Sequence, residues 1–206
     1  MTTQPIWENL LEKSGLMIER WTEDQVLKGI NYSGQKLTHT EFDGCTFQNC
    51  DFSNADLTES DFIKCGFESC NFSLAIISGS GMKEVLFTEC KLVGIHFETC
   101  SDLLFSVNFK NCTLDYSSFF KKKMKKAKFD TCSLKEVDFT ETDLSLAEFN
   151  ACDLSQAIFS NSILEKADFR SAYNFSIDPD KNKIRKARFS TSGLAGLLGK
   201  YNLEIE

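Results

Sequence analysis

The chain has 206 residues, of which 42% are hydrophobic and 26% charged, and its formal net charge is -7. This composition is typical of a folded, soluble domain, and the excess of acids argues against direct binding to nucleic acid, whose phosphates it would repel. No segment is apolar for long enough to span a bilayer, and Glu8, Glu12 and Lys13 interrupt the N-terminus where a signal peptide would be apolar, so we expect a cytoplasmic protein without membrane contact.

Residues 1–30 are predicted to form a cap and a lead-in at one end of the molecule. Within residues 5–14, four apolar side chains fall on one stripe of a helical projection, which indicates a short helix. Residues 15–30 are partly apolar but show no regular period. An amphipathic helix at this position would cover the end of a repetitive fold, which exposes apolar surface there.

The central segment, residues 31–190, repeats with a period of five. Large apolar residues or Tyr recur at every fifth position from Tyr32 to Phe97 and, after a slip of two residues at 98–103, from Leu104 to Phe169. These 28 positions hold 15 of the 19 phenylalanines, and a small residue precedes most of them by two positions. A period of five matches neither an α-helix nor a β-strand. It is expected of a chain that turns a corner every five residues.

Each large residue is predicted to point inward from one wall of a tube, and each small residue to point inward near a corner. The predicted core includes Phe52, Phe62, Phe72, Phe129, Phe139, Phe149 and Phe159. Four walls give a coil of 20 residues, which stacks Cys112, Cys132 and Cys152 in one column. The expected fold is therefore all-β, with about seven coils at a spacing of roughly 4.8 Å.

The nine cysteines all occupy the small inward position, which favours buried, reduced thiols over a metal site or disulfides. Cysteines five residues apart lie on adjacent walls, unlike a chelating Cys-x2-Cys pair. His39 and His96 are isolated, and no phosphate-binding loop, nucleophile elbow or zinc motif is present. We therefore predict no catalytic residues, no cofactor and no metal in a protein that is not an enzyme.

Six lysines between Lys121 and Lys128 form a basic run that has two interpretations. One is a nucleic-acid patch, and the other is a ladder of charge pairs between neighbouring coils. The 20-residue coil favours the ladder, because it brings opposite charges together across the walls. The expected pairs are Lys121 with Glu141, Lys123 with Asp143, Lys128 with Glu148, Arg185 with Glu165 and Arg188 with Asp168. Lys122 occupies a small-residue position, and nothing in the pattern explains it.

The repeat fails after Phe169, where polar residues and a proline take central positions and predict an excursion over residues 173–182. Residues 191–206 are expected to form a separate module. Its leucines fall on one stripe of a helix over residues 193–200, with Ser192 as the N-cap. Alternating apolar and acidic residues after this helix indicate a short strand.

The repeats Ala55-Asp56-Leu57-Thr58-Glu59 and Cys152-Asp153-Leu154-Ser155-Gln156 show a small residue, Asp or Asn, Leu or Phe, and two polar residues. This motif resembles that of the pentapeptide-repeat family, and the resemblance covers roughly residues 30–190. It implies a right-handed quadrilateral β-helix with four repeats per coil. Short helical caps are expected at its N-terminal and C-terminal ends.

The string Asn174-Phe175-Ser176-Ile177-Asp178-Pro179, followed by Ala187-Arg188-Phe189-Ser190 and a leucine-rich helix, is more particular. It resembles the branch of the family that protects topoisomerases. That branch holds the Qnr quinolone-resistance proteins, a microcin immunity protein and, most similar, the albicidin-resistance protein. The resemblance implies a homodimer joined through the C-terminal module. Its expected interface consists of Leu194, Leu197, Leu198, Leu203 and Ile205.

The acidic balance leads to a functional hypothesis. Seven acids and one lysine lie between residues 41 and 68, and the acids are Glu41, Asp43, Asp51, Asp56, Glu59, Asp61 and Glu68. On a rod about as wide as duplex DNA, such carboxylates could imitate phosphates, as relatives are thought to do in the DNA-binding saddle of DNA gyrase or topoisomerase IV. The chain is therefore predicted to protect such an enzyme from a drug or toxin. Two alternatives stay open, namely acids that serve only solubility and a scaffold for another partner.

The Qnr proteins carry projecting loops that matter for protection. In this sequence only the slip at 98–103 and the excursion at 173–182 are candidates for such loops. This difference disfavours quinolones and leaves a peptide toxin or an albicidin-like drug as the inhibitor.

Overall fold

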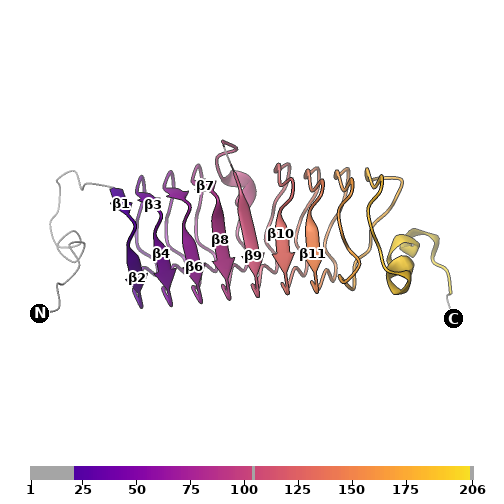
Figure 1. Ribbon diagram of the computed structural model, residues 1–206, viewed down its shortest axis with the longest axis horizontal. Helices are drawn as coiled ribbons and strands as arrows, with labels where there is room; N and C mark the ends of the chain where they lie inside the picture. Colours follow the sequence, from indigo (N-terminus) through magenta and orange to yellow (C-terminus); the bar gives the residue numbers. More distant parts are fainter. Residues whose placement is uncertain (1–20, 104, 205–206) are drawn as a thin grey trace, which may run out of the picture.

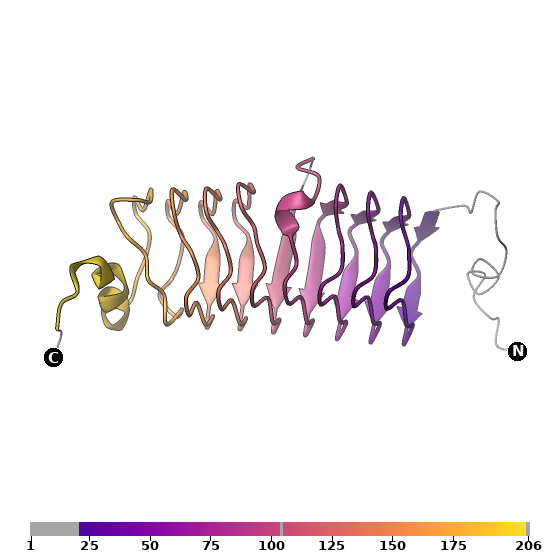
Figure 2. The same cartoon turned by 180° about the vertical axis from the view of Figure 1, so that it is seen from behind.

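A computed structural model describes residues 21–103 and 105–204, which form a straight rod with its first strands at one end and its last helices at the other (Figures 1 and 2). Every strand pairing and every single bridge in the rod is parallel, so the coils stack directly on one another. The expected all-β, right-handed solenoid with four walls is thereby confirmed. The helix predicted at residues 5–14 lies outside the described residues.

Two of the four walls are β-sheets. Wall 1 is a four-stranded sheet of β1 (Trp21–Glu23), β3 (Glu41–Asp43), β5 (Asp61–Ile63) and β7 (Gly81–Lys83). Wall 2 is a seven-stranded sheet of β2 (Val26–Lys28), β4 (Thr46–Gln48), β6 (Gly66–Glu68), β8 (Val85–Thr88), β9 (Val107–Lys110), β10 (Lys128–Asp130) and β11 (Glu148–Asn150). The strands are short because the chain turns a corner after each one.

The other two walls are ladders of single bridges. Wall 3 passes through Asn31, Asp51, Asn71, Lys91, Thr113, Ser133, Asp153 and Tyr173. Wall 4 passes through Lys36, Asp56 and Ile76, and then through His96, Ser118, Asp138 and Ile158. Beyond β7, wall 1 continues in the same manner through Lys123, Asp143, Ile163 and Lys183.

Phenylalanines stack in columns inside the tube. The longest column follows wall 2 through Phe47, Phe67, Phe87, Phe109, Phe129, Phe149 and Phe169, with ring centroids between 4.7 and 5.4 Å apart. A second column follows wall 4 through Phe97, Phe119, Phe139 and Phe159. The seven phenylalanines predicted for the core are all buried. Each such side chain stabilises the fold by roughly 1.5–3 kcal/mol.

Small residues line the inside of each corner, and each column of them has its own chemistry. At the corner between walls 4 and 1, hydroxyl groups donate to main-chain carbonyls 23 positions earlier at 2.5–2.7 Å. This hydroxyl column consists of Ser60, Ser80, Thr142 and Ser162. The corner between walls 2 and 3 stacks six thiols, those of Cys50, Cys70, Cys90, Cys112, Cys132 and Cys152. A buried corner thus needs a residue that is small and, where it is polar, bonded.

The slip predicted at 98–103 is present as an insertion of two residues. Phe67 pairs with Phe87 at a separation of 20, whereas Phe87 pairs with Phe109 at a separation of 22. After the short 3-10 helix η2 (Phe97–Thr99), the chain leaves wall 1 as a loop over residues 100–103 and 105–106, which we call the projecting loop (Figures 1 and 2). The position predicted for Leu104 lies outside the described residues.

The excursion expected at 173–182 adds no residues. The bridges from Asp153 to Tyr173 and from Ile163 to Lys183 both keep the separation of 20. Phe175 and Ile177 are buried in place of the regular repeat. No second projecting loop therefore arises from this segment.

Both ends of the solenoid differ from the expectations. The described part of the lead-in already belongs to the tube, because β1 and β2 pair with β3 and β4 and Leu27 is buried five positions before Tyr32. This first coil is hard to recognise in the sequence. Its outward positions hold the exposed apolar residues Trp21 and Val26, whereas outward positions in most other repeats are polar.

The C-terminal module contains two 3-10 helices, η3 (Thr191–Leu197) and η4 (Gly199–Tyr201), rather than the single α-helix expected. Ser190, not Ser192, caps η3 by accepting a hydrogen bond from the Gly193 amide at 3.1 Å. The described residues after η4 form no strand.

Candidate protein-binding surface

The seven acids predicted to form one surface are distributed over all four walls. Glu41, Asp43 and Asp61 lie on wall 1, Glu68 on wall 2, Asp51 on wall 3, Asp56 on wall 4, and Glu59 at the corner between walls 4 and 1. Each five-residue step carries the chain to the next wall, so acids that are neighbours in sequence point in different directions. These seven residues therefore do not share one face of the rod, and their imitation of phosphates stays a prediction.

Two of the seven acids stabilise the turns of their own repeats. Oδ1 of Asp51 accepts a hydrogen bond from the Ser53 amide at 2.9 Å. Oδ1 of Asp56 accepts from the amide and the hydroxyl of Thr58 at 3.1 and 2.6 Å. The Thr58 hydroxyl and amide lower the pKa of Asp56, because they stabilise its charged form. Both carboxylates thus have a role in the fold.

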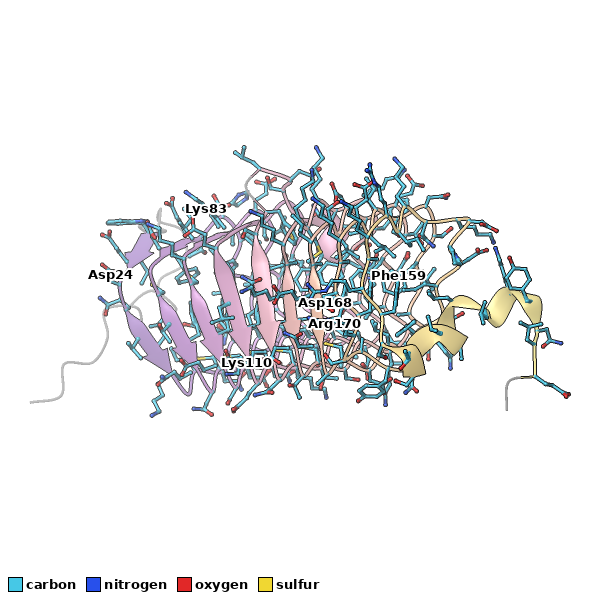
Figure 3. All side chains as sticks on the ribbon, turned by 45° about the vertical axis from the view of Figure 1, so that its right-hand side comes forward. Asp24, Lys83, Lys110, Phe159, Asp168 and Arg170 are labelled. Carbon is cyan, nitrogen blue, oxygen red and sulfur yellow. The ribbon has the colours of Figure 1, made fainter. Side chains whose placement is uncertain are left out.

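Wall 1 and the corner after it carry a row of acids in the first four coils, which we call the acidic face. Its members are Glu23, Asp24, Glu41, Asp43, Asp61 and Glu84. Glu41 and Asp61 are direct register partners on adjacent strands, and Asp24 lies at the N-terminal end of the rod (Figure 3). Within the described part of the chain, none of the six forms an ion pair. A search in steps of 20 residues would have found this row.

The predicted charge ladder forms at two of its five positions. Lys121 Nζ lies 3.6 Å from Glu141, and Arg188 binds Asp168 at 2.8 Å. Asp168 also forms an ion pair with Arg170 at 2.8 Å, and the two side chains lie together on the outside of the rod (Figure 3). Arg170 first, with Arg188 adding to it, lowers the pKa of Asp168 because the cations favour the carboxylate.

The other three predicted pairs are absent among the described residues. Asp143 binds Lys125 at 3.4 Å rather than Lys123, although Lys123 is its register partner. Lys128 and Glu148 are aligned without an ion pair. The fifth pair, Arg185 with Glu165, is also missing. An exposed ion pair gains little free energy, because it orders two long side chains. Alignment of two opposite charges on neighbouring coils is therefore not enough to form a pair.

Lys122 explains how the slip is accommodated. It takes a place in the hydroxyl column, and it is 2% exposed. Its Nζ donates to the Cys100 carbonyl at 2.5 Å and to Asp102 Oδ1 at 2.7 Å, and lies 5.0 Å from the centroid of the Phe105 ring. A serine at this position is too short to reach both of these partners. The long, buried lysine stem reaches them, and its charge is bonded at the base of the projecting loop.

Leu103 in the projecting loop is a large apolar side chain that is 77% accessible to solvent. Beneath the loop is a hollow of about 250 Å³ that is lined by Phe105, Lys123, Lys125 and Lys126 with adjacent main chain. A second hollow of about 180 Å³ lies along the same corner in the last coils. Three lysines are among the nine residues that line the first hollow, and three of the four residues that line the second are basic.

Comparison with known families decides the identity of the fold. The family model for the pentapeptide repeat region matches residues 40–119, and that for pentapeptide repeats in eight copies matches residues 132–173. The chain belongs to the pentapeptide-repeat family. The first matched segment spans the projecting loop, and Lys122 lies in the gap between the two segments.

Two solved structures share the architecture of this chain. Two trypsin-treated variants of QnrB1, a plasmid-mediated fluoroquinolone resistance protein, match with TM-scores of 0.56 and 0.55 and identities of 17% and 16%. They cover 90% and 92% of this chain and 100% of their own. HetL, involved in heterocyst differentiation regulation in the cyanobacterium Nostoc sp., matches with a TM-score of 0.41 and 17% identity over 84% of this chain and 87% of its own. At these identities the likeness concerns the fold alone. No curated protein sequence matches the chain.

The C-terminal module closes the pentapeptide-repeat solenoid. Helix η3 packs so tightly on Phe175 that a Cβ at Gly196 would collide with the Phe175 carbonyl. The Ile177 amide donates to the Gly196 carbonyl at 2.9 Å. Lys200 in η4 binds Asp178 at 2.9 Å and also binds Asp180. The module is thus attached by packing, a main-chain bond and ion pairs.

The residues predicted for a dimer interface divide into two groups. Leu197 packs against the core and Leu198 is half-buried, so both help to attach the module. Leu194 and Leu203 are 49% and 58% exposed. Ile205 lies outside the described residues. Leu194 and Leu203 are thus the leucines that the fold leaves free for a partner.

The cysteines and histidines of this pentapeptide-repeat chain have ordinary surroundings. All nine cysteines are buried, and burial raises the pKa of Cys65 and Cys100 to about 12, which makes their thiols unreactive. His39 and His96 lie near Glu59 and Glu98 at the surface. Among the described residues, no group of His, Cys, Asp or Glu could hold a metal ion. No helix in that part of the chain has the length and apolar character to cross a membrane.

Proposed function

We propose that this protein binds a bacterial type II topoisomerase, DNA gyrase or topoisomerase IV, and protects it from a drug or toxin. The observation that carries the proposal is the acidic face, a row of carboxylates along one wall of a straight rod that form no ion pair with any residue the structure describes. A regular row of negative charge on a rod resembles the backbone of duplex DNA. The protein would occupy the basic DNA-binding saddle of the enzyme, and no covalent bond would form or break.

Electrostatics gives this proposal its physical basis. The acids of wall 1 recur on adjacent parallel strands, which lie about 4.8 Å apart, so their fields add along the wall. A field of this kind steers a basic partner toward the rod and raises the association rate, and it weakens with added salt. The similarity in fold to QnrB1, a fluoroquinolone resistance protein, is consistent with this function.

We also propose that the protein acts as a homodimer joined through the C-terminal module. Exposed Leu194 and Leu203 would be buried between two modules, and the acidic faces would then lie at the two far ends of a longer rod. Light scattering should show a dimer at micromolar concentration, and the pair of substitutions Leu194→Glu and Leu203→Glu should yield a folded monomer. A wild-type monomer under these conditions would contradict the dimer.

DNA supercoiling by gyrase tests the proposed function. The protein should inhibit supercoiling at high concentration, and at lower concentration it should restore activity in the presence of a gyrase poison. Glu41→Lys, Asp43→Lys and Asp61→Lys together should abolish both effects. The matched control replaces Glu68, Glu89 and Glu136, which lie on other walls, by lysine and should keep both effects despite an equal change in net charge.

Equal loss of activity in both triple variants would mean that overall charge, not the acidic face, is responsible. The proposed function would be contradicted by a wild-type protein that does not bind gyrase or topoisomerase IV, does not inhibit them and does not protect them from a poison. The interpretation as a scaffold for another partner would then take its place.

A further inference from the structure

Wall 1 changes the sign of its charge at the projecting loop. In the four coils before the loop, the wall and the corner after it hold six acids and two lysines, a net charge of -4. In the coils after the loop, the same positions are residues 123–126, 143–146, 163–166 and 183–186. They hold seven basic residues and two acids, a net charge of +5. One face of the rod is therefore acidic at one end and basic at the other.

Six of these basic side chains form a line that we call the basic ridge. They are Lys123, Lys126, Lys166, Lys183, Arg185 and Lys186, and all six are exposed. Within residues 21–103 and 105–204, none of them forms an ion pair. The ladder therefore does not neutralise the ridge.

The two hollows of the rod open along this same ridge. Lys123 and Lys126 are among the residues that line the larger one. Three cations, Lys166, Arg185 and Lys186, line the smaller one together with a single acid, Glu165. Concave surface between unpaired cations is suited to receive carboxylates from a partner, because each carboxylate can meet two donors. Shape and charge thus coincide on the same corner.

We propose that the basic ridge is a second contact site, which binds an acidic surface of the same protein partner that the acidic face contacts. This inference rests on the proposed function. The partner would present a basic region to the acidic face and an acidic region to the ridge, with the projecting loop between them. Because reversing the rod would place like charges together, the bipolar wall fixes a single docking orientation.

Two other occupants of the ridge are less consistent with the structure. A second copy paired antiparallel would match acids to bases, but its two-fold axis would pass through the middle of wall 1, where the projecting loop holds the two walls apart (Figure 1). Duplex DNA lying along the wall would meet the acidic face and be repelled. A different folded protein with both a basic and an acidic region avoids the steric conflict at the loop and the repulsion by the acidic face.

Charge reversal on the ridge separates this inference from simple DNA mimicry. Lys123→Glu, Lys126→Glu and Lys166→Glu make the rod more acidic, so a pure mimic of DNA would bind its basic target more tightly. A bipolar contact predicts the opposite, a loss of affinity of about tenfold or more. These three residues are distant in sequence from the C-terminal module, so dimerisation should be unaffected. The control, with Lys28, Lys36 and Lys91 replaced by glutamate on other walls, changes net charge equally.

Affinity for purified DNA gyrase is measured by biolayer interferometry at low and moderate salt, with circular dichroism and light scattering to confirm fold and oligomeric state. The ridge variant should bind at least about tenfold more weakly, and the control should stay within about twofold. Equal or tighter binding by the ridge variant would overturn the inference and leave the proposed function intact. Failure of the wild-type chain to bind gyrase would remove both.

A 20-base-pair DNA duplex, titrated without gyrase and followed by fluorescence anisotropy, tests the nucleic-acid alternative. We expect no binding at moderate salt. Binding that is lost in the ridge variant would overturn the assignment of a protein partner. The neutral variant Lys123→Gln, Lys126→Gln and Lys166→Gln should show an intermediate affinity for gyrase, because it removes attraction without adding repulsion.

Discussion

The regular coils and the coil with the projecting loop solve the same packing problem in different ways. In a regular coil, a hydroxyl such as that of Ser162 fills the corner and donates to the Phe139 carbonyl at 2.7 Å. Beside the loop, Lys122 fills the corner and bonds the Cys100 carbonyl and Asp102. A small donor is enough in a regular corner. Beside the insertion, a long side chain with a charged end takes its place.

This difference shows that a repetitive fold tolerates an irregular segment when one neighbouring residue compensates for it. The phenylalanine columns continue past the slip, since Phe97 still stacks on Phe119 at 4.5 Å and Phe87 on Phe109 at 5.4 Å. The irregularity is thus confined to wall 1. We expect the regular coils to provide most of the stability and the loop coil to provide a site for recognition.

The largest effect should follow from a substitution in a regular coil. Phe139→Ala removes a fully buried ring that stacks on Phe119 and Phe159, and should lower the free energy of unfolding by about 3–5 kcal/mol. Phe105→Ala, the matched change in the loop coil, should cost only about 1–2 kcal/mol because that ring is partly exposed. Urea melts measure both. Equal losses would show that the two regions do not differ in packing.

Lys122 provides the second test of the comparison. Lys122→Ala should lower stability by about 2–3 kcal/mol, because it leaves a gap and removes the donor to the Cys100 carbonyl. Lys122→Met keeps most of the stem and should cost about 1 kcal/mol. Limited proteolysis of the alanine variant should cut first in the projecting loop. An alanine variant as stable as the wild type would contradict the compensating role of Lys122.

The period of five was sufficient to predict the tube, its core and its corners, because inward positions such as Phe52 and Phe139 follow a purely local rule. The slip was visible for the same reason, as a break in that rule. The direction in which the inserted residues point could not be predicted, because an insertion can project outward or be accommodated within the wall. That outcome depends on contacts such as the one between Lys122 and Asp102, 20 residues apart.

The candidate surface was harder to predict than the core. Acids that are close in the sequence, such as Asp51, Asp56 and Asp61, lie on walls 3, 4 and 1. A surface on a four-walled tube is instead made of residues 20 apart, such as Glu41 and Asp61. The prediction of individual ion pairs was incomplete for a further reason. Register aligns two residues but does not determine which of several nearby lysines reaches the acid, as Asp143 shows by binding Lys125.

The smallest effect concerns the ion pairs of the regular coils and depends on pH. Asp168 is bound by Arg170 and Arg188, which lower its pKa in the folded protein below that in the unfolded chain. Its stabilisation is therefore fully present above the ordinary aspartate value of about 3.9 and is lost as the pH falls through the folded-state pKa. Because the group is near the surface, the whole contribution should be at most about 1 kcal/mol.

Urea melts of Asp168→Asn at several pH values measure this contribution. The variant should be less stable than the wild type at pH 7, and the difference should shrink as the pH falls below about 4. Glu148→Gln removes an acid without an ion pair from the same wall, so it controls for the loss of one negative charge. A difference between Asp168→Asn and the wild type that stays constant down to pH 2 would show that Asp168 acts through packing or hydrogen bonding alone. In that case the arginines beside it would be free to bind a partner, and the basic half of the rod would be larger than the basic ridge.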